Sequence, residues 1–129
     1  MDPKMNTVGW FELPVRNMDR AVKFYESVFG FSLIRREFDL LQMALFPSDE
    51  HLPGSSGSLV FAPAHYEPRD NGALLYFSAP SGDLNTELGR VEEVGGRILQ
   101  QKKLIAESAG YMATVLDSEG NRIALHSWK

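Results

Sequence analysis

The chain has 129 residues and a formal net charge of −4, with 43% hydrophobic residues, 23% charged residues and no cysteine. These values predict one globular domain, exclude disulfides and cysteine-ligated metal centres, and argue against partnership with nucleic acid. No apolar run approaches the roughly 20 residues that span a bilayer, and the first residues lack the apolar stretch of a signal peptide, so we expect a cytoplasmic protein that does not bind membranes.

The first half of the sequence predicts one strand, one helix and three further strands. Residues 8–15 are rich in apolar and aromatic side chains, as in a strand. Asn17 is a suitable helix N-cap, and apolar residues recur behind it at three- and four-residue steps until Gly30, which supplies a left-handed stop. The polar loop 47–57 is a candidate lid over a ligand. The remaining strands are expected at residues 31–35, 40–46 and 58–62.

The second half predicts the same order of elements. Residues 64–71 carry proline and charge without periodicity, so we interpret them as a linker between halves spanning residues 7–63 and 72–129. A strand at 73–79 precedes a helix capped by Asp83. The expected buried face of that helix, its stop and the later elements are Leu84, Leu88, Val91 and Val94, then Gly95-Gly96, strands at 97–101, 111–116 and 122–128, and a tight turn at 117–121.

The two halves are degenerate copies of each other. The same offset of 66 residues separates Pro14 from Pro80 and Gly30 from Gly96, and both copies carry apolar residues at matching positions. An internal repeat of this kind determines the architecture. We predict an α+β fold of two βαβββ repeats, in which the sheets form an open, U-shaped mixed barrel with flanking helices. The concave face of such a barrel is where a ligand cleft is expected.

Three motifs resemble the signatures of the vicinal oxygen chelate superfamily, which includes glyoxalase I, extradiol dioxygenases, fosfomycin resistance enzymes and bleomycin resistance proteins. The motifs are residues 15–21 with Phe24-Tyr25 and 29–31, then Gly95-Gly96, and residues 116–125. The resemblance extends from about Trp10 to Trp128. It is specific for the fold and says little about the reaction.

The resemblance implies four metal-ligand positions, and none of them holds a suitable side chain here. Metal-dependent members carry His or Glu five residues before the valine of the first signature, where this chain has Trp10, and the pseudo-symmetric position is Tyr76. The other two positions fall at Ala124 and, to within one residue, at Val60. Indole is only a donor, and valine and alanine offer no ligand atom. One phenol does not replace the ligand set that divalent ions need, so we expect neither a metal nor another cofactor.

Residues two positions away from these should face the same cleft, because strand side chains alternate between faces. That places Glu12, Ser78 and His126 beside Trp10 and Tyr76. A carboxylate near an imidazole can support proton transfer, so Glu12 and His126 are the candidate catalytic residues. The simpler alternatives are that His126 donates to a backbone carbonyl and that Glu12 pairs with an arginine.

The candidate ligand-binding residues are Trp10, Tyr76, Ser78 and Phe61. Aromatic side chains bury a large area and carry a polar tip, which suits either ligand contact or packing. Packing is the simpler role for all of the aromatic residues, and most of all for Phe61 and Trp128. His51 and His65 lie in polar loop segments, where a solvated side chain is the default.

The leading functional hypothesis is a metal-independent small-molecule-binding protein of the glyoxalase/bleomycin resistance type, with its ligand held in an aromatic cleft. The alternative is a glyoxalase-related lyase or isomerase acting on small oxygenated compounds through Glu12 and His126 or a non-standard metal site. A structural or regulatory module is a third hypothesis. Under all three we expect a homodimer, because the relatives commonly pair and exposed sheet edges favour pairing. The sequence leaves open whether the cleft lies within one chain or is shared by two.

Overall fold

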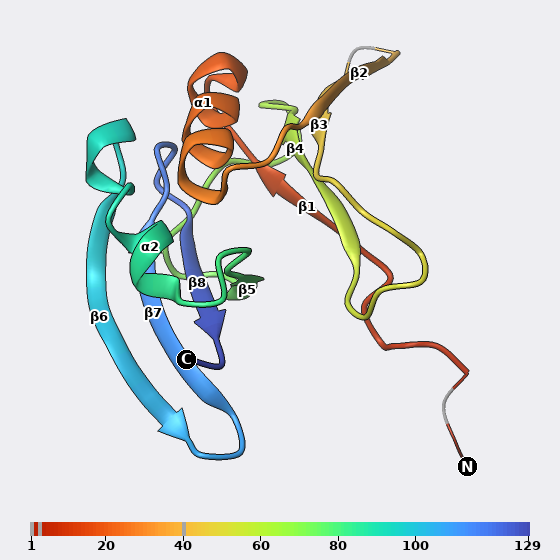
Figure 1. Ribbon diagram of the computed structural model, residues 1–129. Helices are drawn as coiled ribbons and strands as arrows, with labels where there is room; N and C mark the ends of the chain where they lie inside the picture. The colour runs from red at the N-terminus through yellow and green to blue at the C-terminus, as the bar shows by residue number, and fades with distance from the viewer. Residues whose placement is uncertain (1, 3, 40) are drawn as a thin grey trace.

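The computed structural model describes residues 2, 4–39 and 41–129, and it consists of two four-stranded sheets with helix α1 lying between them (Figure 1). The fold is α+β, with one βαβββ repeat in each half, and both sheets are open. The predicted fold class is therefore confirmed. Within the described residues, no helix is long and apolar enough to cross a membrane.

The first half forms a sheet in the order β1-β4-β3-β2, in which β1 and β4 are parallel and the other neighbours are antiparallel. The predicted caps of helix α1 are confirmed: the Asn17 side chain accepts from the Arg20 amide, and Gly30 adopts a left-handed φ of 77°. Residue 40, part of the predicted strand 40–46, lies outside the described residues. The elements are β1 (Trp10–Pro14), α1 (Met18–Phe29), β2 (Ile34–Phe38), β3 (Leu41–Leu45) and β4 (Ser56–Phe61).

The second half repeats this order as β5-β8-β7-β6, again with its first and last strands parallel. Asp83 caps the first turn of α2 by accepting from the Asn85 amide, as predicted. The elements are β5 (Leu75–Ser78), α2 (Leu84–Leu88), the 3-10 helix η1 (Glu92–Val94), β6 (Arg97–Ala106), β7 (Gly110–Leu116) and β8 (Arg122–Ser127).

The predicted continuous second helix is wrong. Helix α2 stops after five residues at Gly89, and a separate 3-10 turn follows before Gly95. Glycine in a helix interior costs about 1 kcal/mol relative to alanine, which favours a stop at this position. Of the expected buried face, Leu84, Leu88 and Val91 are buried, whereas Val94 is only partly buried. Strand β6 also runs five residues past its predicted end at residue 101, with irregularities in its pairing to β7.

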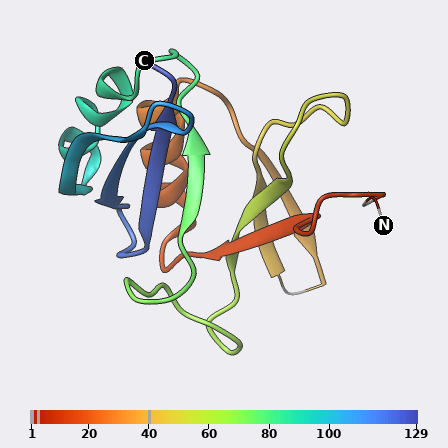
Figure 2. The same ribbon diagram turned by 90° about the horizontal axis from the view of Figure 1, so that it is seen from below.

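The helix-facing sides of both sheets bury their side chains in one shared core. This cluster joins Leu13 of β1 to Leu125 of β8 through Tyr25 of α1, and the Phe77 ring from β5 lies 5.6 Å from the Tyr25 ring. Figure 2 shows α1 and the second sheet on one side of the molecule, with the strands of the first sheet on the other. The opposite faces of the sheets carry exposed side chains, including Trp10 and Tyr76.

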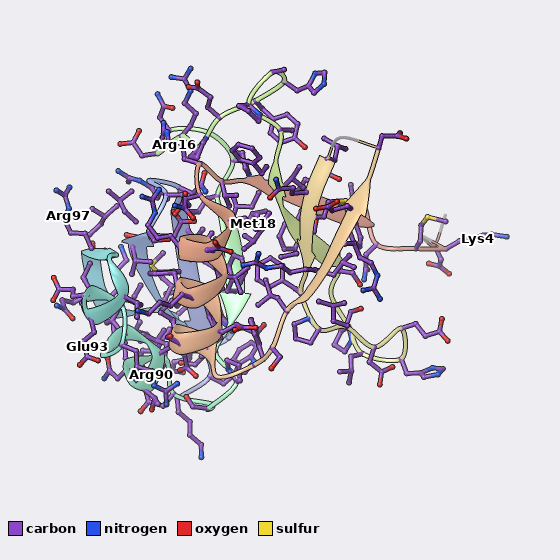
Figure 3. All side chains as sticks on the ribbon, turned by 90° about the horizontal axis from the view of Figure 1, so that it is seen from above. Lys4, Arg16, Met18, Arg90, Glu93 and Arg97 are labelled. Carbon is purple, nitrogen blue, oxygen red and sulfur yellow. The ribbon has the colours of Figure 1, made fainter. Side chains whose placement is uncertain are left out.

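A buried carboxylate, Glu119, fastens the start of α1 to the turn between β7 and β8. Its side chain has no exposed surface and accepts from the backbone amides of Arg16 and Asn17, both at 2.8 Å, and from the Arg20 guanidinium at 2.7 and 2.9 Å. A negative charge is favourable at a helix N-terminus. At the other end of α1, Arg90 donates to the carbonyl of Val28 at 3.0 Å. Figure 3 shows Arg16 and Arg90 at the two ends of the helix.

A second buried carboxylate, Asp117, lies in the same turn. One of its oxygens accepts from the Tyr25 hydroxyl at 2.6 Å and from the Asn121 side-chain amide at 3.0 Å. The other accepts from the backbone amides of Glu119 and Asn121. Burial raises the pKa of Asp117, although these hydrogen bonds act to lower it. The turn that the sequence predicted is therefore also a polar junction between the two halves.

Candidate functional site

Glu12 lies on the exposed face of β1 between two aromatic side chains. The Tyr66 hydroxyl donates to Oε1 at 2.7 Å, and the Trp10 indole donates to Oε2 at 3.4 Å. Partial burial and the bond to Glu12 raise the pKa of Tyr66 to about 12, so the phenol keeps its proton and remains a donor. Within the described part of the chain, Glu12 forms no ion pair with lysine or arginine.

The candidate residues of the second half lie together on β5 and β8. Tyr76 is paired with Ala124 and Ser78 with His126 in the parallel ladder, so each pair shares one face of the sheet. His126 Nε2 lies 2.6 Å from the carbonyl of Ala109, and its ring packs edge-on against Trp128. This contact is the backbone hydrogen bond that the simpler interpretation of His126 predicted.

The five side chains expected to share one cleft thus lie on different sheets of the chain. Trp10 and Glu12 belong to the first sheet, whereas Tyr76, Ser78 and His126 belong to the second. Glu12 and His126 have separate partners, and among the described residues no hydrogen bond joins them. Phe61 is partly buried and packs against the shared core.

A cavity of about 290 Å³ lies between the halves and contains two of the candidate ligand-binding residues, Tyr76 and Ser78. The loop predicted as a lid contributes part of its wall. The remaining wall is mostly aromatic. The lining residues are Phe11, Phe31, Phe46, Pro47, Pro53, Gly54, Ser55, Leu75, Tyr76, Phe77 and Ser78.

The aromatic wall depends on a glycine that lies beside β1. The Phe11 ring covers Gly57, its partner in the parallel ladder, and a Cβ at that position would come within 2.3 Å of the ring. Phe11 can therefore reach Phe46 and Phe77, with ring centroids 5.7 and 6.0 Å away. These separations are typical of favourable aromatic pairs. The repeat and the strand patterns gave no signal for Phe31, Phe46 or Phe77 as cavity-lining residues.

Strand pairing corrects one of the four inferred metal-ligand positions. Because Tyr76 pairs with Ala124, the corresponding partner of Trp10 in the first half is Ser56. Val60 lies opposite Pro14 instead, because β4 begins two residues earlier than predicted. The set Trp10, Ser56, Tyr76 and Ala124 does not fit a divalent ion, which needs several carboxylate or imidazole ligands. Over residues 2, 4–39 and 41–129, no three or more histidine, aspartate or glutamate side chains come together as metal ligands would.

A sequence model described as the Glyoxalase/Bleomycin resistance protein/Dioxygenase superfamily matches residues 7–125. No curated protein gives a significant sequence match.

Solved structures with the same fold include three that illustrate its range. A glyoxalase/bleomycin resistance protein/dioxygenase domain from Frankia sp. EAN1pec has a TM-score of 0.72 at 19% identity, covering 98% of this chain and 100% of that one. An antibiotic binding protein from Streptomyces sp. CB03234, TnmS3, has a TM-score of 0.62 at 23% identity, covering 98% of each. A glyoxalase I mutant from Zea mays has a TM-score of 0.68 at 20% identity, covering 92% of this chain. This chain spans only 45% of the maize protein.

Proposed function

The chain belongs to the glyoxalase/bleomycin resistance protein/dioxygenase superfamily, and on that basis we propose that it is a metal-independent small-molecule-binding protein. The observation that carries the proposal is the cavity between the halves, with four phenylalanine rings in its wall and Tyr76 and Ser78 beside them. Apolar, aromatic walls with a few polar groups are typical of ligand pockets. The ligand is then an apolar or aromatic compound with a polar group that the rim of the cavity, where Ser55, Tyr76 and Ser78 lie, can bind.

The chemistry of the inferred metal positions supports binding over metal-dependent catalysis. Trp10, Ser56, Tyr76 and Ala124 together provide only two hydroxyl groups as ligand atoms. The antibiotic binding protein from Streptomyces has the same fold, and by analogy we propose that this chain acts by sequestering its ligand. The alternative, a lyase or isomerase using Glu12 and His126 or a non-standard metal site, has less support, because among the described residues Glu12 bonds to Trp10 and Tyr66 while His126 bonds to the carbonyl of Ala109.

We further propose that the protein forms a homodimer. The exposed faces carry large aromatic side chains, with Trp10 44% and Tyr76 53% exposed, and β1 and β5 are each paired on one side only. Such surfaces favour association with a second copy. Light scattering after size exclusion should give a mass of about twice 14.5 kDa. A monomer at all concentrations would refute the proposed dimer. The proposed binding cavity would stand, because residues of a single chain line it.

Binding is tested by a thermal-shift screen of aromatic metabolites and drugs in the presence of a chelator. A ligand at about 100 times its Kd should raise the melting temperature by roughly 10 °C, and the shift should be the same without chelator. Ser55 lines the cavity and lies two residues before Gly57, the partner of Phe11, so Ser55→Phe narrows the cavity and should abolish the shift. Ser108→Phe, an equal change at an exposed turn residue, should retain it. A screen without any stabilising compound, or shifts that depend on added metal, would refute the proposal.

A further inference from the structure

A carboxylate between two aromatic rings on an exposed face is a group that can bind a positive charge. The Glu12 carboxylate touches the indole of Trp10 and the phenol of Tyr66 through hydrogen bonds, and both rings keep more than a third of their surface exposed. We propose that Glu12, Trp10 and Tyr66 form a site for an organic cation, such as the ammonium or guanidinium group of a small molecule.

Glu12 shares a surface hollow with Glu67, Arg69 and Arg122, and within the described residues neither arginine forms an ion pair with it. Both donors to its carboxylate are neutral, and an ionised carboxylate has about four lone-pair positions, so capacity remains for a charged donor. None of the ion pairs formed by the described residues includes Glu12. The faces of indole and phenol rings also attract cations.

A buried hydroxyl beside Glu12 adds a second polar group on the same face of the sheet. Ser58 pairs with Glu12 in the parallel ladder, so the two side chains point to one side. The Ser58 side chain is fully buried, and within the described residues its oxygen has no hydrogen-bond partner. Buried polar groups are normally paired. The unpaired Ser58 oxygen is therefore an acceptor on the side of the sheet where Glu12 would hold an ammonium N–H.

The inference rests on the proposed function, because it specifies the charge of a ligand. None of the three residues of the cation site lines the cavity between the halves, although Trp10 and Glu12 belong to the same strand as Phe11, which does. The site is at Glu12 on the exposed face of β1, whereas the cavity contains Phe11, the next residue back along the chain, whose side chain points to the opposite face. The two regions can therefore be tested separately.

The test uses the full chain and benzylammonium, a primary ammonium ion with three N–H donors, as the probe, with benzyl alcohol as the neutral aromatic control. The sequence has two tryptophans, so an ¹⁵N-labelled sample shows two indole N–H resonances, and Trp10→Phe identifies the one from Trp10. The cation should shift the Trp10 resonance in a saturable manner and leave Trp128 in place. Benzyl alcohol at the same concentration should shift neither resonance.

The variant Glu12→Gln should weaken binding of the cation by about tenfold, because the amide keeps the acceptor for Tyr66 and loses the charge. Glu93→Gln removes an equal charge from an exposed position of η1 in the other half and should change the affinity by less than about twofold. Equal shifts with both compounds, or unchanged affinity in Glu12→Gln, would overturn the inference. So would the lack of any saturable Trp10 shift. If any of these results is obtained while neutral compounds still raise the melting temperature in a way that Ser55→Phe abolishes, the proposed function stands without a cation site.

Discussion

Replacing Glu119 with alanine is expected to lower the free energy of unfolding by about 3–5 kcal/mol, which corresponds to a fall of roughly 10–20 °C in melting temperature. The substitution leaves two backbone amides of the α1 N-terminus without their acceptor and breaks the contact with the Arg20 guanidinium. An unsatisfied buried donor costs about 1–3 kcal/mol. Urea denaturation monitored by circular dichroism measures the loss.

The matched control is Glu50→Ala. Glu50 lies in the loop between β3 and β4, which corresponds in element order to the turn between β7 and β8, and its side chain is 88% exposed. Surface changes of this kind usually alter stability by less than about 0.5 kcal/mol. If both variants lose the same stability, the junction between the halves does not depend on Glu119.

The free energy of unfolding should depend on pH differently in the wild type and in Glu119→Ala. Burial acts to raise the pKa of Glu119, but the bonds from Arg20, Asn17, Ser118 and Arg16 outweigh it and hold that pKa below its ordinary value of 4.5. The carboxylate therefore contributes its full stability above pH 4.5, and this contribution is lost as the pH falls through the lowered value. The difference in the free energy of unfolding between wild type and Glu119→Ala, measured by urea denaturation at several pH values, should therefore narrow as the pH falls below 4.5.

Replacing Asp117 with alanine is expected to cost about 3 kcal/mol, because four donors lose one buried acceptor group. Part of this loss is offset, since burial makes the ionised carboxylate unfavourable and raises its pKa. The pH dependence of Asp117 is therefore opposite to that of Glu119. Ionisation of Asp117 lowers the free energy of unfolding as the pH rises through its raised pKa.

Tyr25→Phe provides the comparison for Asp117. It removes only one of the four hydrogen bonds and keeps the ring in the shared core, so a loss of about 1–2 kcal/mol is expected. Chemical denaturation of both single variants and of the double variant measures their coupling. A double variant whose loss equals the sum of the two single losses would contradict a direct role for the Tyr25–Asp117 contact.

The features predicted correctly from the sequence are those encoded locally. Asn17 and Gly30 mark the two ends of α1, and both could be predicted because a cap and a left-handed stop each need only a few neighbouring residues. The 66-residue repeat gave the order of elements in both halves because each copy carries its own local pattern of apolar residues and turn residues. The predicted second helix is too long because the apolar spacing continues past Gly89, whereas the α-helical backbone ends there.

The features missed are those that depend on distant parts of the chain. Glu119 binds Arg16 from 103 residues away, and the turn motif that contains it explains only its local role. Tyr66 reaches Glu12 across 54 residues from a segment without periodicity. The placement of Phe77 beside Phe46 and Phe11 follows from how the halves pack, which strand alternation does not specify. The position of the cavity could therefore be obtained only from the structure.

The most direct test of a small-molecule-binding role is a crystal structure of the protein with the compound that raises its melting temperature most, grown in the presence of a chelator. We predict density for the compound in the cavity between the halves, in contact with Phe11, Phe77 and Ser78. A compound bound away from this cavity, or held through a metal ion, would contradict the account.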